Sequence, residues 1–83
     1  MQLLLFGTSG CHLCEQAEQI IKECLPDKLG LTIETIEISG QEQWEGQYAL
    51  RIPVLYHPET KKELGWPFDQ WHVKEFIKEL SDD

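Results

Sequence analysis

Basic residues are scarce in this 83-residue sequence, which has 7 Lys and Arg against 15 Asp and Glu and a formal net charge of −8. This acidic balance argues against nucleic acids and anionic membrane surfaces as partners, because both attract cations. A long apolar run is also missing, since none approaches the ~20 residues of a membrane span. Residues 1–6 carry no basic side chain and form too short an apolar stretch for a signal peptide. We therefore expect one cytoplasmic domain over residues 1–83, with no membrane partner.

Cysteine is also infrequent, with three in the chain: Cys11, Cys14 and Cys24. An odd number in a reducing compartment argues against a disulfide scaffold. A Cys-x-x-Cys motif is only half of a zinc site, and no second Cys or His pair completes it, so we expect no metal. The spacing is typical of a reactive pair, Cys11 and Cys14, with Cys24 as an apolar core residue.

Hydrophobic periodicity predicts three elements in the first half of the chain. Residues 3–6 are apolar on both faces, which indicates a buried strand. Apolar residues at three- and four-residue spacing predict a helix from residue 11 that ends before Pro26. Residues 31–38 alternate as in a strand, with one slip at residues 34–35 that predicts a bulge. The expected inward face of the helix comprises Leu13, Ala17, Ile20, Ile21, Cys24 and Leu25.

Four more elements are expected in the second half. Residues 39–42 match a capping box and predict a short second helix. Residues 52–56 and 62–65 predict a hairpin of two strands, and Asp69 can cap a last helix. The residues expected to pack inward are Trp44, Tyr48 and Leu50 from the second helix, and Trp71, Val73, Phe76, Ile77 and Leu80 from the third.

The resulting order, β-α-β-α-β-β-α, defines the expected fold class. The first β-α-β unit should be right-handed with parallel strands, and the last two strands should pair as a hairpin. This arrangement gives an α/β fold with a mixed four-stranded sheet and helices on both faces. It is the order of thioredoxin-like folds, and it is the structural context that gives a Cys-x-x-Cys motif its redox interpretation.

The spacing of Cys11 and Cys14 allows a disulfide. Residues three apart on a helical turn have Cβ atoms about 5–6 Å apart, and bridged Cα atoms are roughly 4.4–6.8 Å apart. As a structural cross-link this bridge is weak, because a four-residue loop removes only about 2 kcal/mol of unfolded-state entropy. Reversible thiol–disulfide chemistry is the better interpretation, and two unreactive core cysteines are the alternative.

The predicted place of Cys11, at the start of a helix, favours its thiolate. A free thiol with a pKa of about 8.5 is only about 3% ionised at pH 7. A helix N-terminus can stabilise an anion by up to ~2 kcal/mol, which brings the pKa close to 7. We therefore predict that Cys11 is the nucleophile and Cys14 the resolving thiol. A protonated His12 would lower the pKa of Cys11 further; the alternative is an exposed imidazole without influence.

Two features outside the motif have more than one interpretation. Pro53 opens a strand, where an ordinary trans proline is common. The alternative is a cis bond before Pro53, which on general frequency is rare. Trp66 lies in the loop before the last helix, which in this fold passes close to the redox pair. Together with Phe68, Trp66 forms either an apolar rim for a substrate or a buried anchor for the loop.

Residues 10–15, GCHLCE, and 48–55, YALRIPVL, resemble the glutaredoxin-like branch of the thioredoxin superfamily. The likeness is to short bacterial glutaredoxin-like proteins with Cys-His-Leu-Cys after the first strand. It implies that Cys11 is the exposed nucleophile and that Pro53 is a cis proline facing the pair. It also implies that the backbone of Ile52 pairs with a bound peptide or with glutathione.

The same resemblance implies further substrate contacts. Arg51 is the cation available for a substrate carboxylate, since residues 7–10 lack the lysine that glutaredoxins often carry there. Gly65 and Asp69 are what remains of the family's Gly-Gly and Asp pairs, with Trp66 between them. Electrons would come from glutathione, as a co-substrate, or from a thioredoxin-type reductase.

The sequence therefore predicts a monomeric thiol–disulfide oxidoreductase that acts on protein or glutathione mixed disulfides and holds no tightly bound cofactor. One alternative is a non-catalytic interaction module that binds a partner through Ile52, Trp66 and Phe68. Another is a metal or iron–sulfur carrier that uses Cys11 and Cys14 across a dimer.

Overall fold

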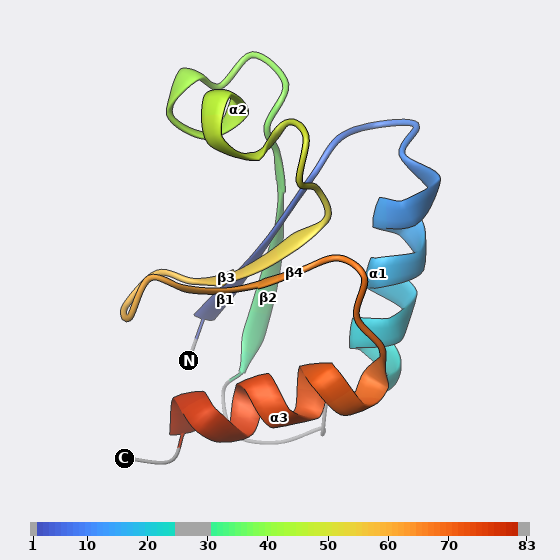
Figure 1. Ribbon diagram of the computed structural model, residues 1–83, viewed down its shortest axis with the longest axis vertical. Coiled ribbons are helices and arrows are strands. Elements are labelled where there is room, and N and C mark those ends of the chain that lie inside the picture. Colours follow the sequence, from blue (N-terminus) through green and yellow to red (C-terminus); the bar gives the residue numbers. More distant parts are fainter. Residues whose placement is uncertain (1, 25–30, 82–83) are drawn as a thin grey trace.

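Four strands form one mixed sheet in the order β2-β1-β3-β4, with β1 parallel to β2 and antiparallel to β3 (Figure 1). The computed structural model describes residues 2–24 and 31–81. Its elements are β1 (Gln2–Gly7), α1 (His12–Cys24), β2 (Thr32–Glu37), α2 (Glu42–Tyr48), β3 (Val54–His57), β4 (Lys62–Gly65) and α3 (Gln70–Ser81). The predicted order of elements and the α/β fold with a mixed sheet are confirmed.

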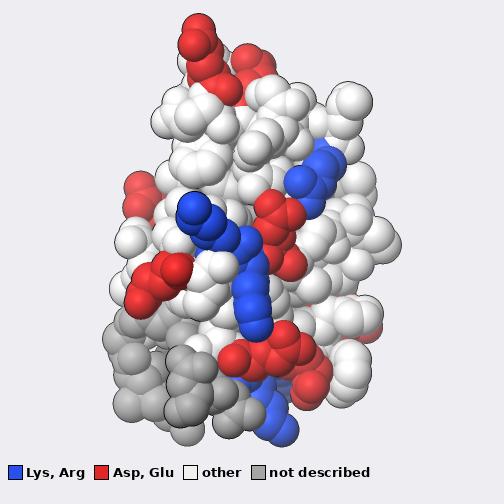
Figure 2. All heavy atoms as spheres, turned by 60° about the vertical axis from the view of Figure 1, so that its left-hand side comes forward, with Lys and Arg blue, Asp and Glu red and all other residues white. Residues whose placement is uncertain are grey.

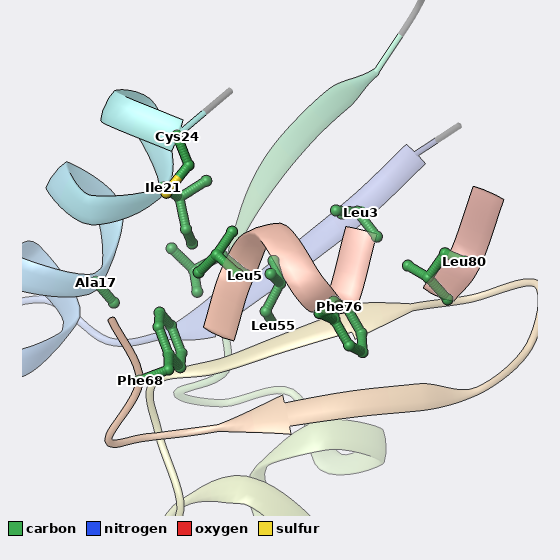
Figure 3. Packing of buried hydrophobic residues seen from close by; sticks show 10 residues of the cluster. Leu3, Leu5, Ala17, Ile21, Cys24, Leu55, Phe68, Phe76 and Leu80 are labelled. Atoms are coloured by element: carbon green, nitrogen blue, oxygen red, sulfur yellow. The ribbon is translucent and has the colours of Figure 1, made fainter. Parts of the chain in front are cut away.

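The sheet separates two hydrophobic cores, because successive side chains of a strand point to opposite faces. On one face Leu3, Leu5 and Leu55 pack with buried residues of α1 and α3. On the other face Phe6 and Val54 pack with α2. The helices therefore cover both faces, as predicted. Figure 3 shows part of the first core, with labelled side chains Leu3, Leu5, Ala17, Ile21, Cys24, Leu55, Phe68, Phe76 and Leu80.

The predicted bulge at residues 34–35 is wrong. The pairing of β1 with β2 runs without a break from Gln2↔Thr32 to Gly7↔Glu37. Ile33 packs against the α1–α3 core and Ile36 against the α2 core. The slip in alternation arises because β2 supplies one isoleucine to each face of the sheet, not because a residue is inserted.

One predicted helix cap is wrong and the other is confirmed. The residue at the N-cap of α2 is Gln41, which makes no side-chain cap, so Ser39 does not begin a capping box. At α3, the His72 N–H donates to Asp69 Oδ1 at 3.0 Å, and the Asp69 N–H donates to His72 Nδ1 at 3.2 Å. This reciprocal pair satisfies two backbone donors at the helix start.

Three residues expected to be buried are exposed. Leu13, in the first turn of α1, is 44% exposed. Trp71 is 64% exposed, with its ring against that of His72, and Leu50 lies beyond the end of α2 and is fully exposed.

The core role of Cys24 is confirmed, since it is 7% exposed and its thiol donates to the Gln70 carbonyl. Leu25 and Pro26 lie outside the described residues. Within 2–24 and 31–81, no helix has the length and apolar character needed to cross a bilayer.

Candidate functional site

A tight turn between β1 and α1 determines where Cys11 lies. The Cys11 N–H donates to the Thr8 carbonyl at 3.3 Å, and Gly10, at the third position of this turn, has a φ of +79°. A type II turn requires positive φ at that position, which glycine adopts without strain. Because α1 begins at His12, the turn places Cys11 at the N-cap of the helix.

The sulfur of Cys11 faces the first turn of α1. The Cys14 N–H donates to Cys11 Sγ at 3.1 Å, so one of the free amides of the helix start already points at this sulfur. The Cα atoms of Cys11 and Cys14 are 5.2 Å apart, and their sulfurs lie at disulfide distance. Both residues are half-buried. The geometry thus allows an anion on Cys11 and a bond between the two sulfurs.

Gly7, the last residue of β1, provides the space that Cys14 occupies. A Cβ atom at Gly7 would lie 3.1 Å from Cys14 Sγ and 3.2 Å from its Cβ, closer than most real contacts of this kind. A side chain here would therefore displace the second sulfur of the pair. The role of this glycine could not be predicted from the sequence, because the need for it depends on how α1 packs over the end of β1.

Pro53 lies at the same end of the sheet as the cysteines. Phe6 of β1 pairs with Val54 of β3, which places Pro53 beside Gly7, the residue that Cys14 lies against. The Ile52–Pro53 bond is cis, as the resemblance implies. The Trp66 N–H donates to the Pro53 carbonyl at 3.1 Å.

Three further residues predicted to bind substrate lie next to Pro53. Gly65 pairs with Val54 in the antiparallel β3–β4 ladder, so Trp66 lies opposite Pro53. Ile52 is half-buried, and its N–H donates to the Tyr48 carbonyl at 3.0 Å. Pairing of a peptide with that N–H would require this bond to open. The structure thus brings Ile52, Pro53, Gly65 and Trp66 together, and their role in substrate binding stays a prediction.

The aromatic pair before α3 anchors its loop. Phe68 is buried in the α1–α3 core, and the half-buried Trp66 ring meets it edge-on with centroids 5.1 Å apart. An apolar rim made by both rings is therefore wrong, and so is the three-residue surface of the interaction-module alternative. Of the two rings, that of Trp66 belongs to a partly exposed residue, whereas Phe68 is buried.

Arg51 is already paired within the chain. Its guanidinium donates to Glu63, and the Tyr48 hydroxyl donates to the other oxygen of the same carboxylate. These two bonds lower the pKa of Glu63, and burial together with Glu63 raises the pKa of Tyr48 to about 12. A substrate carboxylate would have to compete with Glu63 for Arg51. The predicted role of Arg51 in substrate binding therefore requires that its bond to Glu63 opens.

A cavity of about 270 Å³ opens beside the two cysteines, on the β2 side of the site. Its wall includes Cys11, Cys14 and the turn before Cys11, together with three carboxylates from Glu15, Glu18 and Glu37. Among the described residues, no Lys or Arg lines it. Figure 2 shows that the face it displays mixes both signs of charge, with acidic side chains alone at the end that carries α2.

His12 is exposed at the first position of α1, so its predicted influence on Cys11 stays a prediction. Between residues 2 and 81, with 25–30 left aside, no three His, Cys, Asp or Glu side chains cluster as metal ligands would.

Comparison with known proteins agrees with this geometry. The family described as Glutaredoxin-like domain (DUF836) matches residues 2–78. The crystal structure of target protein XcR50 from X. campestris shares 30% identity and superposes with a TM-score of 0.76, over 92% of this chain and 95% of that one. The solution structure of XcR50 gives 31% identity and a TM-score of 0.75, over 94% of each chain. Among curated proteins, none matches.

Proposed function

The chain belongs to the family of glutaredoxin-like domains (DUF836), and on this premise we propose that it is a thiol–disulfide oxidoreductase whose redox pair is Cys11 and Cys14. The observation that carries the proposal is the place of Cys11, a half-buried residue at the N-terminus of α1 whose sulfur accepts the Cys14 N–H and lies at disulfide distance from Cys14 Sγ. Unpaired amides at a helix start favour an anion, which is the reactive form of a thiol.

The reaction proceeds in two exchanges. The Cys11 thiolate attacks one sulfur of the substrate disulfide, forms a mixed disulfide and releases the other sulfur as a thiolate that takes up a proton. Cys14 then loses its proton and attacks the Cys11 sulfur, which releases the second substrate thiol. The substrate gains two electrons and two protons, and the protein is left with a Cys11–Cys14 disulfide.

We propose that protein disulfides are the main substrates and that a thioredoxin-type reductase supplies the electrons. Glutathione carries two carboxylates, whereas the cavity beside the cysteines is lined by three carboxylates and Arg51 is bonded to Glu63. Glutathione mixed disulfides remain the second substrate class. We place this activity in the cytoplasm, because a reducing compartment keeps the two thiols reduced and available. The protein acts as a monomer without a tightly bound cofactor.

Insulin reduction with dithiothreitol as electron donor tests the proposal. We expect the wild-type protein to accelerate precipitation of the insulin B chain, and the Cys11→Ser variant to give the uncatalysed rate. Cys24→Ala serves as the matched control, because that thiol is buried in the core and outside the site. Full activity in Cys11→Ser would exclude the proposed function.

A further inference from the structure

The turns that precede α1 and α2 have the same local structure. In the turn formed by residues 8–11, the last N–H donates to the first carbonyl at 3.3 Å, and Gly10 has a φ of +79°. In the turn formed by residues 38–41, the same bond measures 3.0 Å, and Gly40 has a φ of +81°. Each turn has Ser-Gly at its centre, and each ends at the residue before a helix. The two turns follow two paired parallel strands, so they lie at the same edge of the sheet.

The carboxylate of Glu37, the last residue of β2, bonds to both turns. Its Oε1 accepts from the Ser9 N–H and from the Ser9 hydroxyl, each at 2.9 Å. Its Oε2 accepts from the Ser39 N–H at 3.2 Å. One side chain therefore engages the second residue of each turn and connects the segment that presents Cys11 to the end of β2.

Hydrogen bonding keeps this carboxylate ionised. Bonds from the Thr8 and Ser9 hydroxyls lower the pKa of Glu37 to about 2. A carboxyl whose pKa falls on folding contributes stability above its unfolded pKa, about 4.3, and loses that contribution as the pH falls through its folded pKa. The bridge is thus complete at every pH at which a thiolate forms.

Main-chain pairing alone reaches only to the base of the turn. The Ile38 N–H donates to the Gly7 carbonyl at 3.0 Å, one step beyond the paired strands. Ser9 lies two residues further along, and there the contact with the β2 end is made by the Glu37 side chain. Loss of this side chain should loosen the turn without disturbing the sheet.

We infer that Glu37 is a positioning residue for the redox pair: by bonding Ser9 it holds the turn that keeps the Cys11 sulfur against the first amides of α1. The inference rests on the proposed function, since it concerns the reactivity of the same nucleophile. Position and charge predict opposite effects here. A looser turn disfavours the Cys11 thiolate, whereas removal of a nearby negative charge favours it.

Alkylation of the reduced protein by iodoacetamide, followed over pH with fragment masses that distinguish Cys11 from Cys14, separates the two effects. In Glu37→Ala we expect the rate at Cys11 at pH 7 to fall by about threefold to tenfold, with the profile displaced to higher pH. Glu37→Gln keeps one oxygen that can accept from Ser9. Its alkylation rate at Cys11 should therefore lie between those of the wild type and Glu37→Ala. Glu34→Ala is the matched control, because Glu34 is an exposed carboxylate of β2 bonded to the Gln2 side chain at 3.0 Å.

An unchanged or faster rate in Glu37→Ala overturns the inference, and so does an equal change in Glu37→Ala and Glu37→Gln, which indicates charge alone. Because Glu37 is exposed, we expect all three variants to fold, and circular dichroism checks this. Alkylation requires no disulfide substrate. A protein that shows the expected series but does not reduce insulin therefore refutes the proposed function and leaves the role of Glu37 intact.

Discussion

A Cys14→Ser variant accumulates a covalent mixed disulfide between Cys11 and its substrate, and its turnover of protein disulfides falls at least about a hundredfold. The reason is that Cys14 supplies the second thiol from within the same molecule. Well-oriented intramolecular groups can react with effective concentrations of about 10⁵ M or more, and a thiol in solution cannot match this concentration. Non-reducing electrophoresis and intact mass measure the adduct after incubation with reduced insulin chains and an oxidant.

The companion variants locate this adduct. Cys11→Ser should form none, since the attacking sulfur is gone, and Cys24→Ala should behave as wild type because Cys24 is buried beside Ile21 in the α1–α3 core (Figure 3). An adduct that persists in Cys11→Ser, or that maps to Cys24, contradicts the assignment of roles to the two cysteines.

Phe6→Ala destabilises the protein by about 3–5 kcal/mol, as expected for loss of a fully buried aromatic ring. Phe6 has no exposed surface, and its ring centroid lies 4.8 Å from that of Trp44, 4.6 Å from Tyr48 and 5.4 Å from Tyr56. The whole chain is expected to have roughly 4–12 kcal/mol of stability at typical values per residue. The substitution therefore removes a large part of it and unfolds a fraction of the molecules.

Urea denaturation followed by circular dichroism measures this loss. Trp71→Ala is the matched control, because it also removes an aromatic ring, but one that is 64% exposed, and should change the stability by about 0.5 kcal/mol or less. If Phe6→Ala proves too unstable to purify, the smaller truncation Phe6→Leu should show a lesser loss of the same sign. Equal midpoints for Phe6→Ala and Trp71→Ala would show that the α2 core does not carry the stability assigned to it.

The order of elements was predictable because each element has a clear period. Residues 3–6 are apolar on both faces, and the strand they form does contribute to both cores. The positions of Val73, Phe76 and Leu80 follow helical spacing, and all three are buried. The apolar character of Trp71 alone favours that inward face. Trp71 lies two positions before Val73, and residues two apart on a helix face nearly opposite sides, so Trp71 points away from the core.

The structure of the turns before α1 and α2 could not be predicted from periodicity. Ser39 followed by Glu42 has the spacing of a capping box, but Ser39 and Gly40 form the centre of a turn, so the helix begins two residues later than the motif indicates. The repeated Ser-Gly of residues 9–10 and 39–40 was the available signal of two similar turns. The part played by Glu37 depends on which strands are neighbours, which the sequence of one strand does not contain.

The candidate site was predicted in its centre but not in its surroundings. Cys11, Cys14 and the cis bond before Pro53 follow from the motif and from the family resemblance. The pairing of Arg51 with Glu63 was not foreseen, because these residues meet only through packing of the segment before β3 against β4. The space that Gly7 leaves for Cys14 has the same kind of origin.

Equilibration of the protein in glutathione redox buffers, with acid quenching and mass measurement of each thiol state, tests the central claim most directly. We predict one reversible two-electron transition that converts Cys11 and Cys14 together between dithiol and disulfide, with a potential between about −270 and −200 mV, the range from thioredoxin to glutaredoxins. Cys24 should remain reduced throughout. A protein in which Cys11 and Cys14 never form a bond to one another at any buffer ratio would contradict the account.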